Sequence, residues 1–535
     1  MTYEFNYIYL IPYILYMFVV MIKYVHMFQQ NQYLTKRYFL WFRRNIRKCF
    51  PFIDIVLMGV FNVFAFYNVF SYQELDYYFA GLFATLVLKQ LLGLRLKPSK
   101  KKLRITARVK RQFFTLALII LGTAYLIVYT DQDVFLKFSP TNVYSKLTLF
   151  AVFSSSYILI VHVINLPFEL SNNFRYLSLA KWKLKRHTRL VKVGITGSFG
   201  KTSSKNVLKE VLSNHYYILA SPKSFNTPMG LTITIRQYLK PLHQMFIAEM
   251  GAYKRGEIKE LANLVKPKYG ILTWIGPAHL ESFGSMENIQ KGKFELIESL
   301  PSDGCGVLNY DNKFIREYQL KNDCQVVTYA TTTEDVDLYL FDVISTKQGT
   351  TFKVKVTQTN QVFEFETKLL GLHNIYNIVS SLGIAYSLGI DFNSLKRSIR
   401  KLKPIKHRLE IKDMGSYTLI DDSFNSNPVG SKTALDILSD MVGQKIIITP
   451  GMIELGSEQY RLNMEFGQHI AAVCDEVILV GKTQTKPIQD GLSSKGYNNY
   501  HVVKNINAAF ALASKVRKDN CYILIENDLP DLYNE

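Results

Sequence analysis

The sequence has few cysteines and few acidic residues, and each shortage narrows the class of protein. The five cysteines in 535 residues form no CxxC pair and no other metal-like spacing, so they predict neither a disulfide framework nor a zinc site. Asp and Glu number 43 against 64 Lys and Arg, which gives a formal net charge of +21. Such a charge suits either nucleic acid or an anionic membrane surface. No nucleic-acid recognition motif accompanies it, so nucleic acid is not an expected partner.

The first third of the chain has long apolar segments, and the basic residues gather beside them, as in membrane-flanking loops. The first segment has no basic residue before it and no cleavage site after it, so it does not resemble a cleavable signal. We predict an all-α transmembrane domain over residues 1–170. Five segments carry almost no charge over nearly the roughly 20 residues that cross a bilayer core, and they span residues 5–22, 51–72, 77–94, 113–130 and 147–167.

The loop charges predict the orientation of this domain. The connections after the first and third segments are rich in Lys and Arg and the others are not, so the N-terminus is expected outside and the chain after Pro167 in the cytoplasm. Five spans are predicted, with four as the alternative because Lys89 weakens the third. Lys89 and Asp54 are expected to reach the headgroups from cytoplasmic ends, and a transport role is the alternative. Residues 171–189 form a basic linker or surface helix.

The segment GITGSFGKTSSKN, which begins at Gly194, has the pattern of a phosphate loop. It follows a short apolar run and precedes a stretch with helical spacing of apolar residues. A strand, a glycine turn and a helix N-terminus direct unpaired N–H groups at an anion. Lys201 would reach the outer phosphates of a nucleotide, and the Thr202 hydroxyl would bind Mg²⁺. Ile195 stands where the usual spacing has a glycine, so the pattern is T-G-S-x-G-K-T.

This loop resembles the ATP loop of the Mur ligase superfamily, the enzymes that form amide bonds in cell-wall synthesis, and in particular its MurF-type members. His407 and Phe424 stand where the family has glycine and tyrosine. The end of the chain departs further, because CYILI is followed by ENDLP and not by K-G-S-R, which bears on the choice of amine. Seven further segments resemble the family in the right order: SFNTPMG, FIAEMGAYKRGEI, YGILTWIGPAHLESFGSMENIQKGKFELI, GLHNIYN, KHRLE, LIDDSFNSNP and TPGMIELG.

The resemblance implies two Mg²⁺ sites. Thr202 and Glu249 would hold the first ion, since a carboxylate at a strand tip beside a phosphate loop suits Mg²⁺; a surface Glu that caps the next element is the alternative. His279 and Lys293 would hold the second, with Lys293 carbamylated by CO₂ and Lys291 as the alternative lysine.

The resemblance also implies the ATP contacts and the residues of the chemical step. Lys201, His279 and Lys293 would be catalytic, and domain closure would exclude water from an acyl phosphate. The residues expected to bind ATP are Gly197, Ser198, Gly200, Lys201, Thr202, Ser203, Asn374, Asn377, Arg408 and Asp422.

The expected fold after the membrane domain is α/β in two parts. By resemblance, residues 190–403 form the central P-loop ATP-binding domain with a mostly parallel sheet, and residues 404–535 form a doubly wound, Rossmann-like C-terminal domain. Residues 335–367 alternate with period two and predict an antiparallel excursion. The uridine-nucleotide-binding domain of the soluble members is absent, and the membrane domain stands in its place.

These features predict a multi-pass membrane protein whose cytoplasmic domains form an ATP-dependent, ADP-forming amide ligase of Mur type. Its partners would be an amine, a carboxylate carried on a lipid-linked or membrane-made polymer, membrane lipids, and other proteins of envelope synthesis. The alternatives are a poly-γ-glutamate-type synthetase, an ATP-driven membrane transporter or sensor, and a catalytically silent scaffold.

Overall fold

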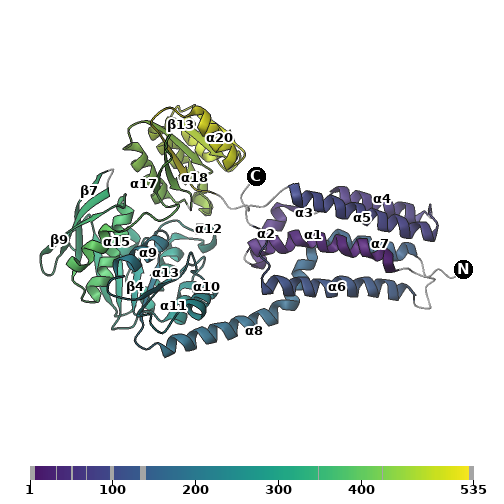
Figure 1. The fold of residues 1–535 in the computed structure, drawn as a ribbon, viewed down its shortest axis with the longest axis horizontal. Coiled ribbons are helices and arrows are strands. Elements are labelled where there is room, and N and C mark those ends of the chain that lie inside the picture. Colours follow the sequence, from purple (N-terminus) through teal and green to yellow (C-terminus); the bar gives the residue numbers. More distant parts are fainter. Residues whose placement is uncertain are drawn as a thin grey trace. The chain divides into compact units, whose positions relative to one another are not determined.

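The computed structural model describes residues 7–31, 33–49, 52–67, 69–96, 102–132, 140–346, 349–424 and 426–528. Residues 5, 6, 51 and 68 of the predicted spans lie outside this description. The chain divides into two compact units, which consist mainly of Met1–Asn172 and Asn173–Leu529. Figure 1 labels the elements of both.

The first unit is all helical, as its apolar segments predict. Helix α1 packs against α5 and α6, and α7 packs against α4 and α6 (Figure 1). The elements are a 3₁₀ turn (Tyr7–Leu10), α1 (Ile11–Gln30), α2 (Thr35–Arg44), α3 (Ile46–Cys49), α4 (Phe52–Phe66), α5 (Tyr72–Leu96), α6 (Ala107–Gln132), α7 (Pro140–Val152), a second 3₁₀ turn (Phe153–Ser156) and α8 (Tyr157–Arg186).

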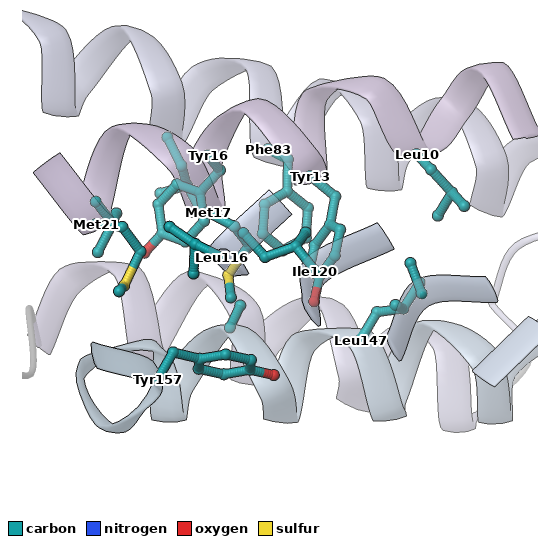
Figure 2. Close-up of a cluster of buried hydrophobic side chains, with 14 of the residues drawn as sticks. Leu10, Tyr13, Tyr16, Met17, Met21, Phe83, Leu116, Ile120, Leu147 and Tyr157 are labelled. Carbon is teal, nitrogen blue, oxygen red and sulfur yellow. The ribbon is translucent and has the colours of Figure 1, made fainter. Parts of the chain in front are cut away.

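Large aromatic and aliphatic side chains fill the space between these helices. Figure 2 shows Tyr13, Met17, Phe83, Ile120 and Leu147 gathered in one buried cluster. The Tyr13 and Phe83 rings meet edge to face with their centroids 5.2 Å apart, an arrangement that the ring quadrupoles favour. The outer helix faces carry exposed large apolar side chains as well, among them Leu88, Leu118 and Val163, as expected of a surface that contacts lipid.

Among the described residues, four helical segments are long and apolar enough to span a membrane, namely Tyr7–Gln30, Gln73–Gly93, Ala107–Tyr129 and Val143–Arg186. The expected count of five is therefore reduced to four, the alternative count. The short segment is the second and not the third: α4 has 15 residues, which gives a helix of roughly 22 Å against a hydrocarbon core of about 30 Å.

Asp54 and Lys89 do not behave as independent charges at a membrane surface. Asp54 is 1% exposed, and its carboxylate is ion-paired with Lys89. Gln90 donates to the same carboxylate at 2.8 Å and Tyr16 at 3.2 Å. The prediction that Asp54 reaches the headgroups is wrong, because these donors satisfy it inside the helix bundle.

The last predicted span is interrupted. Residues 147–167 cover the end of α7, the 3₁₀ turn Phe153–Ser156 and the start of α8. Three consecutive serines in this turn offer the backbone alternative hydrogen bonds, which disfavours a continuous α-helix. Helix α8 then continues through Pro167 to Arg186, so most of the predicted basic linker is helical.

The middle domain is built on a nine-stranded sheet in the order β2-β3-β1-β4-β5-β6-β7-β8-β9. The strands from β2 to β7 are parallel, and β8 and β9 are antiparallel. The expected antiparallel excursion is therefore confirmed. The strands are β1 (Val191–Thr196), β2 (Ile218–Ala220), β3 (Met245–Glu249), β4 (Tyr269–Leu272), β5 (Cys305–Asn309), β6 (Gln325–Ala330), β7 (Leu338–Thr346), β8 (Gly349–Val356) and β9 (Gln361–Thr367).

Helices cover both faces of this sheet. One apolar cluster includes Val207 and Leu382, from α9 and α15, and the other includes Leu261 and Phe294, from α11 and α13. The helical elements are α9 (Lys201–Val211), α10 (Pro228–Ile233), a π-helical turn (Thr234–Tyr238), α11 (Glu257–Val265), α12 (Leu280–Phe283), α13 (Met286–Phe294), α14 (Lys313–Arg316), α15 (Leu372–Ser387) and α16 (Lys396–Arg400), with 3₁₀ turns at Ile297–Ser299 and Phe392–Leu395.

The C-terminal domain has a six-stranded sheet in the order β10-β11-β15-β12-β13-β14, parallel except for β10. Separate apolar clusters lie on its two faces, as expected of a doubly wound sheet. The sequence did not predict β10. The elements are β10 (Glu410–Asp413), β11 (Thr418–Asp422), α17 (Pro428–Ser439), β12 (Gln444–Thr449), a 3₁₀ turn (Gly456–Glu458), α18 (Gln459–Val473), β13 (Glu476–Val480), α19 (Lys486–Ser494), β14 (Tyr500–Val503), α20 (Ile506–Val516) and β15 (Cys521–Glu526).

Candidate active site

The phosphate loop connects the end of β1 to the start of α9. Gly197 and Gly200 have φ of 150° and 80°, which are values that side chains with a Cβ atom rarely adopt. A Cβ atom on Gly197 would lie 2.0 Å from Oγ1 of Thr273, so only glycine fits there. Because α9 begins at Lys201, its first unpaired N–H groups and its dipole face the loop, as an anion site requires.

Lys201 is folded back over this loop. Its Nζ donates to the carbonyl oxygens of Gly197 at 2.7 Å and Ser198 at 3.1 Å. Burial lowers the pKa of Lys201 to about 8, because the charged form loses its hydration. The ammonium group is thus held at the loop by backbone oxygens, which a phosphate oxygen could replace.

Glu249, at the tip of β3, lies beside the same loop. The Thr202 hydroxyl donates to its carboxylate at 3.0 Å, Lys205 binds it at 3.0 Å, and Asn226 donates at 3.2 Å. Thr202 and Glu249 therefore present neighbouring oxygen atoms, the ligand type that Mg²⁺ prefers. Sequence reasoning missed Lys205 and Asn226; Asn226 lies in SFNTPMG, but nothing in the spacing links either residue to Glu249.

His279 connects the two domains. Its Nδ1 donates to Glu454 of the segment that follows β12, and its ring centroid lies 4.5 Å from that of Tyr253. Burial lowers the pKa of His279, and the nearby Lys201 and Lys293 act in the same direction. The three residues expected to be catalytic are thus within electrostatic reach of one another, with Nε2 of a neutral imidazole available as a ligand.

Lys293 and Lys291 lie in different environments on α13. Lys293 is 1% exposed, and its Nζ has a weak contact of 3.4 Å with the carbonyl oxygen of Ala252 and lies 5.2 Å from the Phe283 ring. Burial lowers the pKa of Lys293 well below its usual value. Lys291 is exposed and pairs with Glu287 one helical turn away.

A cavity of about 260 Å³ lies between the middle and C-terminal domains. The four residues expected at this junction, Asn374, Asn377, Arg408 and Asp422, all line it. Aromatic side chains that the sequence did not single out form much of its wall, and a Trp274 ring stacks toward Tyr376 with centroids 6.2 Å apart. The other missed lining residues include Phe199, Tyr329 and His373.

Several polar groups beside this cavity are incompletely satisfied. Asn377 accepts from the Ser204 hydroxyl at 2.6 Å, but within the described residues its buried Nδ2 has no hydrogen-bond partner. Nδ1 of His373 is also buried and has no hydrogen-bond partner among the described residues. Burial lowers the pKa of His373 to about 4. Arg408 lies over the Phe424 ring at 4.4 Å. Buried donors without partners in a cavity wall are typical of a ligand site.

A glycine loop at a helix N-terminus and a cavity where two α/β domains meet are the features of a nucleotide-binding enzyme. The Mur ligase middle domain matches residues 195–385, and the Mur ligase, glutamate ligase domain matches residues 407–525. The chain therefore belongs to the Mur ligase family, whose members are ATP-dependent, ADP-forming peptide ligases of peptidoglycan synthesis.

Curated relatives agree with this assignment. The UDP-N-acetylmuramoyl-tripeptide–D-alanyl-D-alanine ligase of Escherichia coli (strain K12) is 31% identical over 308 residues, which is 57% of this chain and 67% of the relative. The enzyme of the same name from Bacillus subtilis (strain 168) is 30% identical over 294 residues, 54% of this chain and 62% of the relative.

Solved structures show the same fold. A crystal structure of MurF from Acinetobacter baumannii aligns with a TM-score of 0.61 at 21% identity and covers 66% of this chain and 77% of that one. MurF ligase from Thermotoga maritima in complex with ADP aligns with a TM-score of 0.59 at 23% identity, and the alignment covers 66% of this chain and 80% of that one.

Proposed function

We propose that the protein is a membrane-anchored ligase that activates a carboxylate of an envelope polymer precursor as an acyl phosphate and joins it to an amine. The family matches begin at residue 195, and most of residues 7–186 form helices, four segments of which are long and apolar enough to span a membrane. The single observation that carries the proposal is this combination of apolar helices with a complete phosphate loop. A carboxylate carried on a lipid is the substrate class that such a chain would meet.

The nucleotide would lie between the phosphate loop and the cavity at the domain junction. The N–H groups at the start of α9 and the Lys201 ammonium would stabilise the charge that develops on the transferred phosphoryl group. Asn374 and Asn377 would bind the rest of the nucleotide with Arg408 and Asp422, since all four line the cavity. Closure of the C-terminal domain on the middle domain would exclude water from the acyl phosphate.

The donor set beside the loop fits Mg²⁺. Thr202 Oγ1 and the Glu249 carboxylate lie within 3.0 Å of each other, and we assign them to the first ion. His279 and Lys293 are assigned to a second ion. When bound, these ions would supply positive charge to the phosphoryl and carboxylate oxygens. The chain's own contribution is to orient Glu249, which Lys205 and Asn226 hold by hydrogen bonds.

Lys293 is also the lysine that we propose for carbamylation. Only a neutral amine attacks CO₂, and burial favours the neutral form of Lys293. A carbamate would turn this buried side chain into an anionic oxygen ligand. Lys291 is a poorer candidate because it is exposed and paired with Glu287.

A transporter or sensor role has less support. It required charged residues along a path through the spans, but Asp54 and Lys89 bind each other, and Gln90 and Tyr16 complete the Asp54 hydrogen bonds. This cluster joins α1, α4 and α5 and therefore has a sufficient structural explanation.

The phosphate-loop assignment is tested with Lys201→Ala in the full-length protein. Carboxylate-dependent ADP release should fall by at least about a thousandfold, because an electrostatic contact worth several kcal/mol to the transition state is lost. Lys209→Ala is the matched control, since Lys209 lies on the same helix and is exposed. Retained turnover in Lys201→Ala would contradict the assignment.

The substrate class is tested by ligation assays on native membranes. Equal amounts of a lipid-linked peptidyl precursor and of the soluble uridine nucleotide precursor would be offered with ATP. We expect preferential ligation of the lipid-linked form, and a preference for the soluble nucleotide would refute this part of the proposal.

A further inference from the structure

Glu526 is a buried acidic residue at the carboxyl end of a central strand of the C-terminal sheet, next to a residue that lines the proposed nucleotide cavity. It is the last residue of β15, and in the parallel pairing with β11 its Cα partner is Asp422. Glu526 is 0% exposed, whereas Asp422 lines the cavity. Glu526 therefore stands directly behind a cavity residue. The K-G-S-R stretch that the family resemblance led us to expect after this strand is absent.

The hydrogen bonds of Glu526 leave one oxygen atom for Asp422. Its Oε1 accepts from the Ser426 hydroxyl at 2.6 Å. No N–H or O–H group of the described residues donates to the buried Oε2, and the Asp422 carboxyl group lies beside it. Two adjacent buried carboxyl groups cannot both ionise at low cost, so one of them retains a proton. Burial, and then the charge of Asp422, raise the pKa of Glu526 well above its usual value.

Asp422 transmits this contact to the segment that joins the two domains. Its Oδ1 accepts from the backbone N–H of Leu409 at 3.2 Å, and its charge acts on the neighbouring Arg408. The backbone N–H of Asn527 donates to the Asp422 carbonyl oxygen at 3.2 Å. The Asp422 carboxylate thus has Glu526 beside it on the neighbouring strand. It also accepts a hydrogen bond from the segment that carries Arg408 to the cavity.

Among the described residues, the charges that act on Asp422 are those of Asp421 and Arg408, besides Glu526, and Glu249 acts on Arg408 in turn. Asp421 precedes Asp422 on β11 and Arg408 lies across from it. On the other side of β15, the parallel partner β12 ends at Thr449, which is buried and uncharged.

We propose that Glu526 is a positioning residue for the ligase: its protonated carboxyl group donates a hydrogen bond to Asp422 and holds that carboxylate where it orients Arg408 toward the nucleotide. The inference rests on the nucleotide site proposed above. An amide at position 526 preserves both contacts, because it can accept from Ser426 and donate to Asp422. An aliphatic side chain of similar size preserves neither.

The experiment measures ATP affinity by titration calorimetry on the full-length protein in nanodiscs, with Mg²⁺ present. Glu526→Leu should weaken ATP binding about tenfold, the effect of losing one hydrogen bond to a charged group. Glu526→Gln should bind ATP within about twofold of the wild type near neutral pH. Thermal unfolding of each variant reports separately on stability.

A pH series on Glu526→Gln distinguishes this role from simple packing. As pH rises through the raised pKa of Glu526, the wild type loses the shared proton and its two carboxylates repel each other, so its ATP affinity should fall relative to that of Glu526→Gln. The ratio of the two affinities cancels the titration of Lys201, which both proteins contain. This comparison does not require Glu526→Leu to fold.

A ratio that stays constant over the pH series, or a Glu526→Gln variant as weak as Glu526→Leu, would overturn the positioning role while ATP binding by the wild type stays intact. Failure of the wild type to bind ATP would instead overturn the proposed nucleotide site and, with it, this inference. The two failures are therefore distinguishable.

Discussion

One buried lysine of the ligase unit, Lys293, differs from the buried charges of the helical unit. In the helical unit they neutralise one another: Asp54 is ion-paired with Lys89, and Glu169 with Arg111. In the ligase unit, Lys293 is as deeply buried as Asp54, but within the described residues no carboxylate lies within ion-pair distance of it. Its nearest recorded partners are a carbonyl oxygen at 3.4 Å and an aromatic ring at 5.2 Å.

This difference separates structural charges from functional ones. A buried ion pair stabilises one arrangement of the elements that it joins, and the ligase unit has such a pair as well, Lys205 with Glu249 beside the phosphate loop. A buried polar group without a partner costs free energy, and a ligand that hydrogen-bonds to it recovers that cost. Asn377 and His373 also fit the second description. The comparison therefore assigns binding to the cavity of the ligase unit and scaffolding to the charge pairs of the helical unit.

Lys293 provides the strongest test of this comparison. Lys293→Ala should reduce ADP release by about a thousandfold, because a metal-held anionic ligand is worth several kcal/mol in the transition state. A small added carboxylate such as acetate should restore part of the activity, since it can replace a carbamate in the space left behind. Lys291→Ala, on the same helix, is the control and should retain activity within about twofold. Full activity of Lys293→Ala would show that Lys293 has no part in catalysis or metal binding.

The Asp54–Lys89 pair should show the opposite behaviour, with an effect on stability alone. Lys89→Met leaves a buried carboxylate without its cation and should destabilise the helical unit by about 3 kcal/mol. The double variant Asp54→Asn, Lys89→Met should recover most of this loss, because no uncompensated charge remains. Thermal unfolding in detergent measures both, with Lys110→Met as an exposed control on α6. A Lys89→Met variant as stable as the wild type would show that the pair does not hold the helices.

Much of the ligase fold could be predicted from the sequence, because local signals were strong. The glycine spacing of the phosphate loop predicted its strand, turn and helix, and the period-two pattern of residues 335–367 predicted an antiparallel excursion, which the pairs β7–β8 and β8–β9 form. The short strand β10 was missed. It has only four residues, and its pairing with β11 depends on a turn and not on an apolar run.

The contacts that complete the candidate site could not be predicted, because they join distant segments. His279 meets Glu454 across 175 positions of sequence, and Glu249 meets Asn226 and Lys205 through the packing of β3 beside α9. In the helical unit, hydropathy located five apolar segments but did not show that α4 ends after 15 residues or that a 3₁₀ turn interrupts the last segment. It also could not show that Asp54 and Lys89 face each other, since a pairing 35 positions apart depends on how α4 and α5 pack.

The pH dependence of ATP binding tests whether Lys201 is a buried charge that a bound ligand satisfies. Its pKa in the ligand-free protein is lowered to about 8 by burial, and a bound phosphate favours the ammonium form. Binding therefore takes up a proton above pH 8, and ATP affinity should fall by up to about tenfold for each pH unit above that value. Below pH 8 the lysine is already protonated, so this contribution should vanish. Calorimetry in buffers of different ionisation enthalpy measures the proton uptake, and Lys201→Met should abolish it.

The smallest expected effect concerns Phe424, which stands where the family resemblance led us to expect tyrosine. Its ring lies 4.4 Å from the Arg408 guanidinium. The Phe424 side chain is 49% exposed, so this contact is expected to contribute less than a buried one. Phe424→Leu should raise the KM for ATP about threefold, the effect of an exposed cation–π contact. Phe424→Tyr retains an aromatic face and should leave the KM within about 1.5-fold of the wild-type value. If Phe424→Leu and Phe424→Tyr behave alike, Arg408 is held by Asp422 and the cavity alone, and the ring has no part in positioning it.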